Sequence, residues 1–318
     1  MPIASFLSSL IQGPAQSIAD LTVFPLLRHP APEPWYDTLS SAVAAGTARV
    51  TEVSAMGSVP ELRVVNESPR HVLIVDGEEL VGAKQNRIVN LTILVPPKSS
   101  ITIPVSCVEA GRWQQQSQEF QPADRAFHAI GRRAKVQQVS MSLCADGAPR
   151  SDQSAIWGEI DAKSARMGAR SSTRAASAMF EVQRAKLDHF VDGLKPIDGQ
   201  VGAIFAIRGQ IAGLDVFDAP RTWAALMPKL VRSYGLDALD MGIGGDGFAQ
   251  PDPRRFLDAV CHARCTAYPA VGAGQDLRLE GGGIVGAALS TEHGIVHAVA
   301  FPSAEVTRPR SRRIWGQS

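Results

Sequence analysis

Short apolar segments, each bounded by turn residues, run through the first third of the chain. They occupy residues 21–27, 48–53, 62–65, 71–75, 88–95 and 101–108. The stretches between them, as at 66–69 and 96–100, are rich in the proline, asparagine and serine that are typical of turns. A single helix is predicted among them, over 35–45, with Gly46 as its C-cap. Strands at this spacing, without long helices between them, favour an antiparallel sandwich or barrel over a parallel sheet.

The apolar period becomes helical after residue 121. Apolar positions recur at helical intervals from 122 to about 195, with a break at 146–149. The last third mixes both periods. Its predicted strands cover 201–207, 276–279, 284–290 and 295–301, its predicted helices cover 221–234 and 253–263, and a glycine-rich loop is predicted at 241–247.

These patterns predict an α+β fold. A β-rich, sandwich-like antiparallel N-terminal part (1–121) would be followed by a helical segment (122–200) and a C-terminal α+β part (201–305) that packs back on the sheet. An Arg-rich tail (306–318) closes the chain. One continuous domain is the alternative to this division, because 318 residues suffice for one large domain or two ordinary ones.

The composition and charge of the chain argue against two classes of partner, nucleic acids and membranes. The chain is 45% hydrophobic and 20% charged, with a formal net charge of +1, so no global field attracts nucleic acid or an acidic membrane. The N-terminus lacks the basic segment of a secretory signal, and no apolar run approaches the roughly 20 residues that span a bilayer. We therefore expect a cytoplasmic protein without a nucleic-acid or membrane partner. The pattern leaves the oligomeric state open.

A dense polar cluster lies between two apolar segments, at residues 76–87. Its charged and amide members are Asp76, Glu78, Glu79, Lys84, Gln85, Asn86 and Arg87. Burying so many polar groups unpaired would cost several kcal/mol each, so they must be solvated, paired with one another or engaged in binding a ligand. One hypothesis gives Glu78 or Glu79 a proton-transfer or metal-binding role, with phosphate or carboxylate oxygens held by Lys84 and Arg87. The alternative is a structural knot that ties a β-arch together.

In this hypothesis Gln85 and Asn86 orient the ligand. Two further residues, Glu109 and Arg112, follow the strand at 101–108 and would join the cluster if that strand neighbours the one that starts at Ile88. Cys107 has no histidine adjacent in sequence to activate it, so we expect a buried, unreactive thiol.

Cofactor signals are weak throughout the chain. The spacing of Cys261 and Cys265 is poor for zinc, so we predict no metal site. The glycine-rich loop at 241–247 lacks the residues of a phosphate-binding P-loop, and no cofactor can be named. His297, inside a predicted strand, is expected to be a core residue.

Two segments carry a family resemblance. Residues 78–87 (EELVGAKQNR) and 103–113 (IPVSCVEAGRW), in that order, resemble the bacterial ARG and rhodanese-phosphatase-superfamily-associated protein domain, where ARG denotes ADP-ribosylglycohydrolase. Residues 51–62 and Asp152-Gln153 with Trp157 fit the same pattern, and the resemblance covers most of the chain. It implies, by analogy only, a link to ADP-ribose or NAD-derived metabolites, and it transfers no catalytic residue.

Two functions follow as expectations. The first is binding or processing of a phosphate-bearing small molecule, with an ADP-ribose derivative as one candidate. The second is a non-catalytic binding or scaffold module that partners an ADP-ribosyl-processing enzyme.

Overall fold

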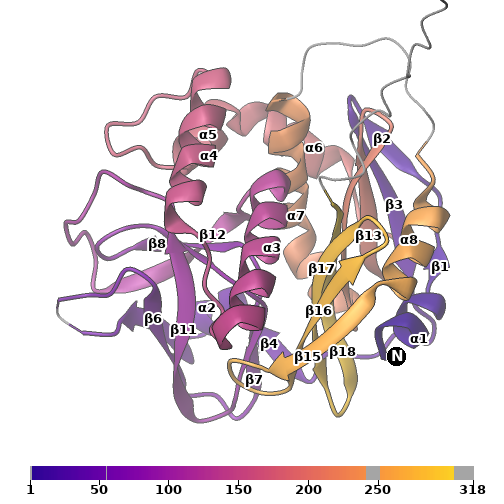
Figure 1. Cartoon of the computed structure of the whole chain (residues 1–318), viewed down its shortest axis with the longest axis horizontal. Coiled ribbons are helices and arrows are strands. Elements are labelled where there is room, and N and C mark those ends of the chain that lie inside the picture. The colour runs from indigo at the N-terminus through magenta and orange to yellow at the C-terminus, as the bar shows by residue number, and fades with distance from the viewer. Residues whose placement is uncertain (1, 55, 241–250, 304–318) are drawn as a thin grey trace, which may run out of the picture.

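The computed structural model describes residues 2–54, 56–240 and 251–303 (Figure 1). Its helices are α1 (Pro2–Ser8), α2 (Leu39–Ala44), α3 (Ala129–Asp146), α4 (Gln153–Arg166), α5 (Ser177–Val182), α6 (Arg184–Gly193), α7 (Pro220–Asp240) and α8 (Pro253–His262). Its strands are β1 (Ile11–Gln12), β2 (Gln16–Ile18), β3 (Leu21–Leu27), β4 (Tyr36–Thr38), β5 (Ala48–Glu52), β6 (Glu61–Asn66), β7 (His71–Ile74), β8 (Glu78–Gly82), β9 (Arg87–Val89), β10 (Ile93–Val95), β11 (Ser99–Cys107), β12 (Glu119–Ala126), β13 (Gln200–Ile207), β14 (Gln210–Phe217), β15 (Arg264–Pro269), β16 (Gln275–Gly281), β17 (Ile284–Thr291) and β18 (Gly294–Pro302). The α+β class predicted from the sequence is confirmed.

A nine-stranded antiparallel sheet forms one side of the molecule (Figure 1). Its strand order is β1-β3-β13-β14-β18-β17-β16-β15, with β2 paired to β3. Both faces are covered, and neighbouring residues on one strand point to opposite faces. Phe205 therefore packs in the core beneath α7, whereas Ile204 packs in the core beneath α1 and α8. Because β3 pairs with β13, this sheet crosses the boundaries predicted at residues 121 and 200.

The N-terminal strands close into a barrel, with neighbours in the order β11-β6-β5-β12-β8-β9. Apolar residues at alternate positions fill it, as Leu62 and Val64 of β6 do, while Glu61 and Arg63 face outward. This alternation is typical of barrel strands, and the barrel is one of the two architectures that the spacing of the strands predicted. A small sheet, β10-β7-β4, adjoins it.

Helices fill the space between barrel and sheet. The long helix α7 contacts both β12 of the barrel and β13 of the sheet (Figure 1). The ring of its Tyr234 stacks on Phe205 with centroids 3.9 Å apart. Asp152 and Asp252 are the N-caps of α4 and α8, since each accepts a backbone hydrogen bond from the first turn. Within the described ranges, no helix has the length and apolarity needed to cross a membrane.

Several elements differ from the sequence prediction. The strand predicted at 88–95 is two strands, because Asn90 and Thr92 leave the sheet and bond to Lys135 and His297. The predicted helix at 35–45 begins only after β4, with Thr38 as its N-cap. The helical segment begins after β12. The strands that were not predicted are β1, β2, β4, β8, β12, β14 and β15. The predicted loop at 241–247 and tail at 306–318 lie outside the described residues.

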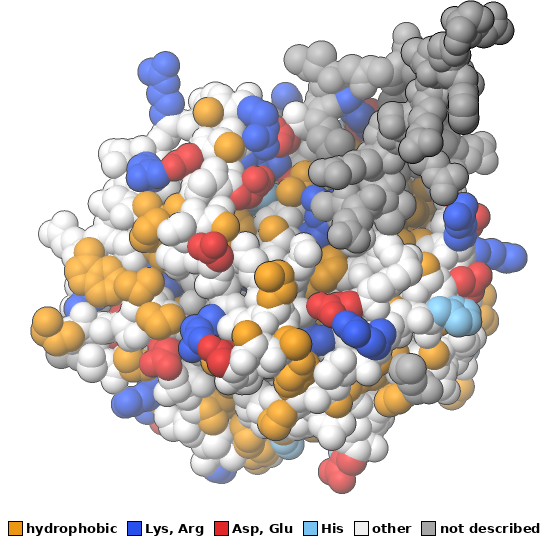
Figure 2. Space-filling view, in the orientation of Figure 1, with side chains coloured by type: hydrophobic (Ala, Val, Ile, Leu, Met, Phe, Trp, Pro, Cys, Tyr) orange, Lys and Arg blue, Asp and Glu red, His pale blue; other side chains and the backbone are white. Residues whose placement is uncertain are grey.

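Acidic and basic side chains are interspersed over the surface seen in Figure 2, in keeping with the small net charge. Charges also occur inside the molecule, where barrel and sheet meet. Arg132 of α3 is fully buried and binds Asp215 of β14 through two hydrogen bonds of 2.6 and 3.0 Å. Its Nε donates to Asp76, next to the barrel, over 3.2 Å. Burial alone would lower the pKa of Arg132, but Asp215 raises it above its usual value, so the guanidinium stays charged.

We predict that Asp215→Asn destabilises the protein by about 3–5 kcal/mol, because it leaves the buried Arg132 charge without its main partner. Urea unfolding measures the change. The control is Glu67→Ala, which removes an exposed partner of Arg49 and should cost about 1 kcal/mol or less. Equal losses in the two variants would contradict a stabilising role for the buried pair.

Candidate functional site

The two glutamates predicted as catalytic lie at the start of β8, and both are buried. Glu78 forms an ion pair with Lys229 of α7 and also accepts a 3.3 Å hydrogen bond from the backbone N–H of Val75. Glu79 binds Arg125 of β12 through hydrogen bonds of 2.6 and 3.2 Å. Each carboxylate thus has a cationic partner from another element, which is the arrangement of a structural ion pair.

The other predicted residues converge at one end of the barrel, where β9 and β11 run side by side. Glu109 accepts hydrogen bonds from Arg112 Nε at 2.8 Å, from the backbone N–H of Asn86 at 3.2 Å and from Thr173 Oγ1 at 2.8 Å. Burial alone would raise the pKa of Glu109, but Arg112 and Thr173 lower it below its usual value. The carboxylate is therefore ionised and fixed, and it fastens the loop at 109–112 to the end of β9.

Two amides complete this network. Gln85 donates from Nε2 to the backbone oxygen of Glu109 at 3.0 Å, and its Oε1 accepts from Arg87 Nη1 at 2.9 Å. Asn86 Oδ1 accepts from Arg112 Nη2 at 3.0 Å. The structure therefore brings Gln85, Asn86, Arg87, Glu109 and Arg112 together, whereas Glu78 and Glu79 bind other elements.

Arg87 is the unusual member of the group. It is fully buried, yet its Nε and Nη2 have no hydrogen-bond partner in the part of the chain that the structure describes. These two nitrogens form one side of the planar guanidinium, which we call the open edge of Arg87. Burial lowers the pKa of this side chain, while nearby Glu52 acts in the opposite direction. A buried charged donor without an acceptor is costly, so the open edge requires an explanation.

The surroundings of Arg87 combine aromatic, cationic and acidic groups. The Trp113 ring, which is 48% exposed, lies 5.6 Å from the Arg87 guanidinium carbon and 5.5 Å from Lys84 Nζ. Glu52, at the end of β5, accepts a 3.4 Å hydrogen bond from the backbone N–H of Lys84. Gly57 packs against all three, since a Cβ there would lie 3.1–3.4 Å from Lys84, Glu52 and Trp113.

Cys107 is opposite Arg87 in the β9–β11 register and is fully buried. Burial raises the pKa of its thiol, although Arg87 and the neighbouring Trp157 indole act to lower it. The side-chain amide of Gln153 of α4 accepts a hydrogen bond from the backbone N–H of Cys107 and donates one to its backbone oxygen, both at 2.8 Å. The position matches the expected buried, unreactive thiol.

We expect Cys107 to react slowly with iodoacetamide in the folded protein, because the reagent must reach a buried and protonated sulfur. Cys144 is exposed and serves as the internal control. Mass spectrometry of peptides after brief alkylation measures both. Labelling of Cys107 as fast as that of Cys144 would show that the thiol is accessible.

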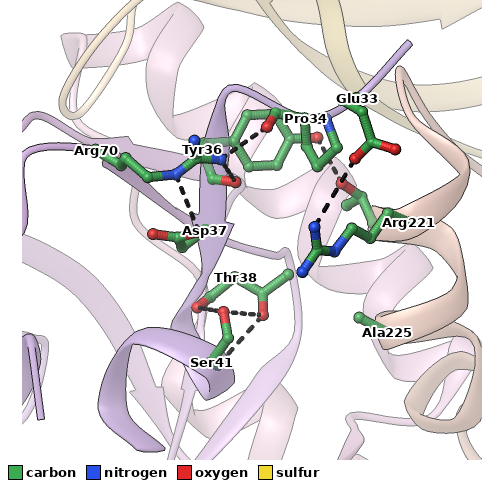
Figure 3. A pocket seen from close by; sticks show the side chains of 10 residues that line it. Glu33, Pro34, Tyr36, Asp37, Thr38, Ser41, Arg70, Arg221 and Ala225 are labelled. Atoms are coloured by element: carbon green, nitrogen blue, oxygen red, sulfur yellow. Dashed lines mark hydrogen bonds and ion pairs between the residues drawn. The ribbon is translucent and has the colours of Figure 1, made fainter. Parts of the chain in front are cut away.

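A separate hollow of about 360 Å³ lies between residues 33–41 and the first turns of α7 (Figure 3). Arg221 reaches across it toward Glu33, with the charged atoms 3.9 Å apart. Tyr36 borders it and donates from its hydroxyl to the carboxylate of Asp218. Burial raises the pKa of Asp218 to about 6, although Tyr36 and Arg28 act in the opposite direction. None of the residues lining this hollow belongs to the predicted cluster.

Asp218 should make stability depend on pH. Its folded-state pKa lies above the usual value of an aspartate, so its contribution to stability is complete below about pH 4 and is lost as the pH rises through about 6. We expect Asp218→Asn to gain stability relative to the parent between pH 4 and 7, as measured by chemical denaturation. Asp198→Asn, at an exposed position, is the control. A constant difference between Asp218→Asn and the parent over this range would contradict the raised pKa.

Sequence reasoning missed the buried partners that hold the molecule together. They are Arg125, Arg132, Lys135, Lys163, Asp215, Lys229 and Asp237. A signal existed for some of them, because Arg132 lies four residues before Val136 and Lys163 lies three after Ile160, on apolar helix faces. A charged residue in such a stripe indicates a buried ion pair. In the described portion of the chain, no three His, Cys, Asp or Glu side chains are arranged to hold a metal.

A family model described as the ARG and Rhodanese-Phosphatase-superfamily-associated Protein domain matches residues 9–301. The chain belongs to this family. The match confirms the family indicated by the two motif segments, and it spans the barrel, the helices and the nine-stranded sheet. No curated protein and no solved structure matches the chain. The network around Arg87 thus lies within the family domain.

Proposed function

We propose that this member of the family binds an anionic small molecule and holds two of its phosphate or carboxylate oxygens at the open edge of Arg87. The observation that carries the proposal is the pair of buried nitrogens, Nε and Nη2, without partners among the residues described. The Nε–Nη2 side of a guanidinium presents two parallel N–H groups, which match two oxygens of a carboxylate or phosphate.

The rest of the network fixes this geometry in advance. Arg87 Nη1 is held by Gln85, which is held in turn by the backbone of Glu109. Glu109 is itself locked by Arg112 and Thr173. A donor that is oriented before the ligand arrives loses less entropy on binding. Glu109 and Arg112 therefore support the site without touching the ligand.

In this proposal Glu78 and Glu79 are structural and not catalytic, because each already neutralises a cation from another element. Trp113 lies over the guanidinium and is half exposed, so it is the side chain that moves when a ligand enters. Its ring can then stack on a planar part of the ligand. A phosphate-bearing metabolite such as an ADP-ribose derivative combines these features, and it is the first ligand to test.

The test is Arg87→Met, assayed by titration calorimetry with inorganic phosphate, pyrophosphate and ADP-ribose. The parent should bind at least one of them, and the variant should lose about 1.5–3 kcal/mol of binding free energy for each charge-assisted hydrogen bond. Unliganded stability should change by only about 1 kcal/mol, because a buried charge with an open edge is replaced by an apolar chain of similar length. Arg49→Met, at a partly exposed position in β5, is the control.

The proposal fails if the parent binds none of these anions. It also fails if Arg87→Met binds them as well as the parent does. A stability loss above about 3 kcal/mol with unchanged binding would show instead that Arg87 belongs to a structural knot.

A further inference from the structure

A second unsatisfied buried group lies in the cluster around Trp113 and Lys84 that also contains Arg87, and it is of the opposite kind. Glu52 Oε2 is buried and has no hydrogen-bond partner within the described ranges, although its other oxygen accepts from the backbone N–H of Lys84. Trp113 links the two residues, since a Cβ on Gly57 would lie 3.3 Å from Glu52 Oε2 and 3.4 Å from Trp113, whose ring lies 5.6 Å from the Arg87 guanidinium carbon. In keeping with this cluster, Glu52 acts to raise the pKa of Arg87. No hydrogen bond or ion pair between them occurs in this structure, so a group placed between them could serve both.

Such a group must accept hydrogen bonds on one side and donate one on the other. Arg87 offers N–H donors only, and a carboxylate such as Glu52 can only accept. An oxyanion without hydrogens satisfies Arg87 but sets its negative charge against Glu52. An oxyanion that also carries a hydroxyl hydrogen satisfies both.

We propose that the Arg87 site selects an oxyanion bearing its own hydroxyl hydrogen, as hydrogen phosphate or a hydroxylated phosphate ester does, and discriminates against a fully deprotonated oxyanion such as sulfate. This inference rests on the proposed function, because it names the ligand class of the same site. Glu52 is the specificity-determining residue, and Arg87 supplies the attraction common to all anions.

The residues above the pair strengthen this discrimination. Gly57 has a φ of +76°, a conformation that favours glycine, and a Cβ there would lie 3.3 Å from Glu52 Oε2 and 3.4 Å from Trp113. The close approach of backbone and indole excludes water from Glu52 Oε2. In a site with little water, an unmatched charge or hydrogen bond costs more than it does at the surface.

The experiment compares phosphate with sulfate by titration calorimetry at pH 6, where phosphate is mostly the monoanion with two hydrogens. The parent should bind phosphate at least about tenfold more tightly than sulfate, the factor expected for one mismatched charged hydrogen bond. In Glu52→Gln the side-chain amide can donate to a bare oxygen, so sulfate binding should strengthen and phosphate binding should weaken. Glu52→Gln should therefore bind phosphate and sulfate about equally tightly.

Glu61→Gln, at an exposed position in β6, is the matched control and should keep the parent's preference. Thermal unfolding of each variant without ligand confirms that it is folded; Gln retains the shape of Glu52 and the oxygen that accepts from Lys84. If an unfolded Glu52→Gln is obtained, Glu52→Asp provides the second variant, and retraction of its carboxylate should also reduce the preference.

The outcomes separate the two proposals. If the parent binds neither anion, this inference is overturned, whereas the proposed function fails only if pyrophosphate and ADP-ribose do not bind either. If the parent binds both anions equally and Glu52→Gln changes nothing, the site is an anion site and the selectivity inference alone is overturned. A tenfold preference that is lost in Glu52→Gln and kept in Glu61→Gln supports both.

Discussion

The barrel and the nine-stranded sheet depend on one buried guanidinium for their relative position. Arg132 of α3 bonds Asp215 of the sheet and Asp76 beside the barrel, and Lys135, one turn further along α3, binds the same Asp76. Charges this deep are favourable only when their partners are held at the correct distance and angle. The sheet, the helix and the barrel can therefore pack in few ways that keep the pairing intact.

The same principle explains why the polar motif is divided between two roles. Glu78 binds Lys229 of α7 and so attaches the barrel to that helix, whereas Glu79 binds Arg125 of β12 and joins two neighbouring strands of the barrel. A few residues further along, Gln85 and Asn86 face the loop after β11, where their bonds hold Arg87 in place. One short segment thus serves the packing of the whole molecule at one end and the candidate site at the other.

The sequence predicted what is local. Short apolar segments bounded by turn residues predicted β5, β6, β9 and β11 of the barrel. The pairing of β9 with β11 meets the condition under which Glu109 was expected to join the polar cluster. It could not supply partners distant in the chain, such as Lys229 for Glu78 or Asp215 for Arg132, because no local period relates them. The sequence missed the division of residues 88–95 into two strands for the same reason, since the partner of Thr92 is the distant His297. The open edge of Arg87 could not be predicted, because a sequence does not show which hydrogen bonds a buried side chain lacks.

The place of β3 in the sheet has a consequence for synthesis. This strand leaves the ribosome well before its central partner β13, and Phe24 pairs with Ile204. All strands and helices of the barrel and of the helical layer up to α6 emerge between them. The apolar residues of β3 cannot pair with β13 until that strand has been made. A strand that stays unpaired during synthesis is prone to aggregate. Production in the cell should therefore be more sensitive to changes on the apolar faces of β3 than their effect on the finished fold would indicate.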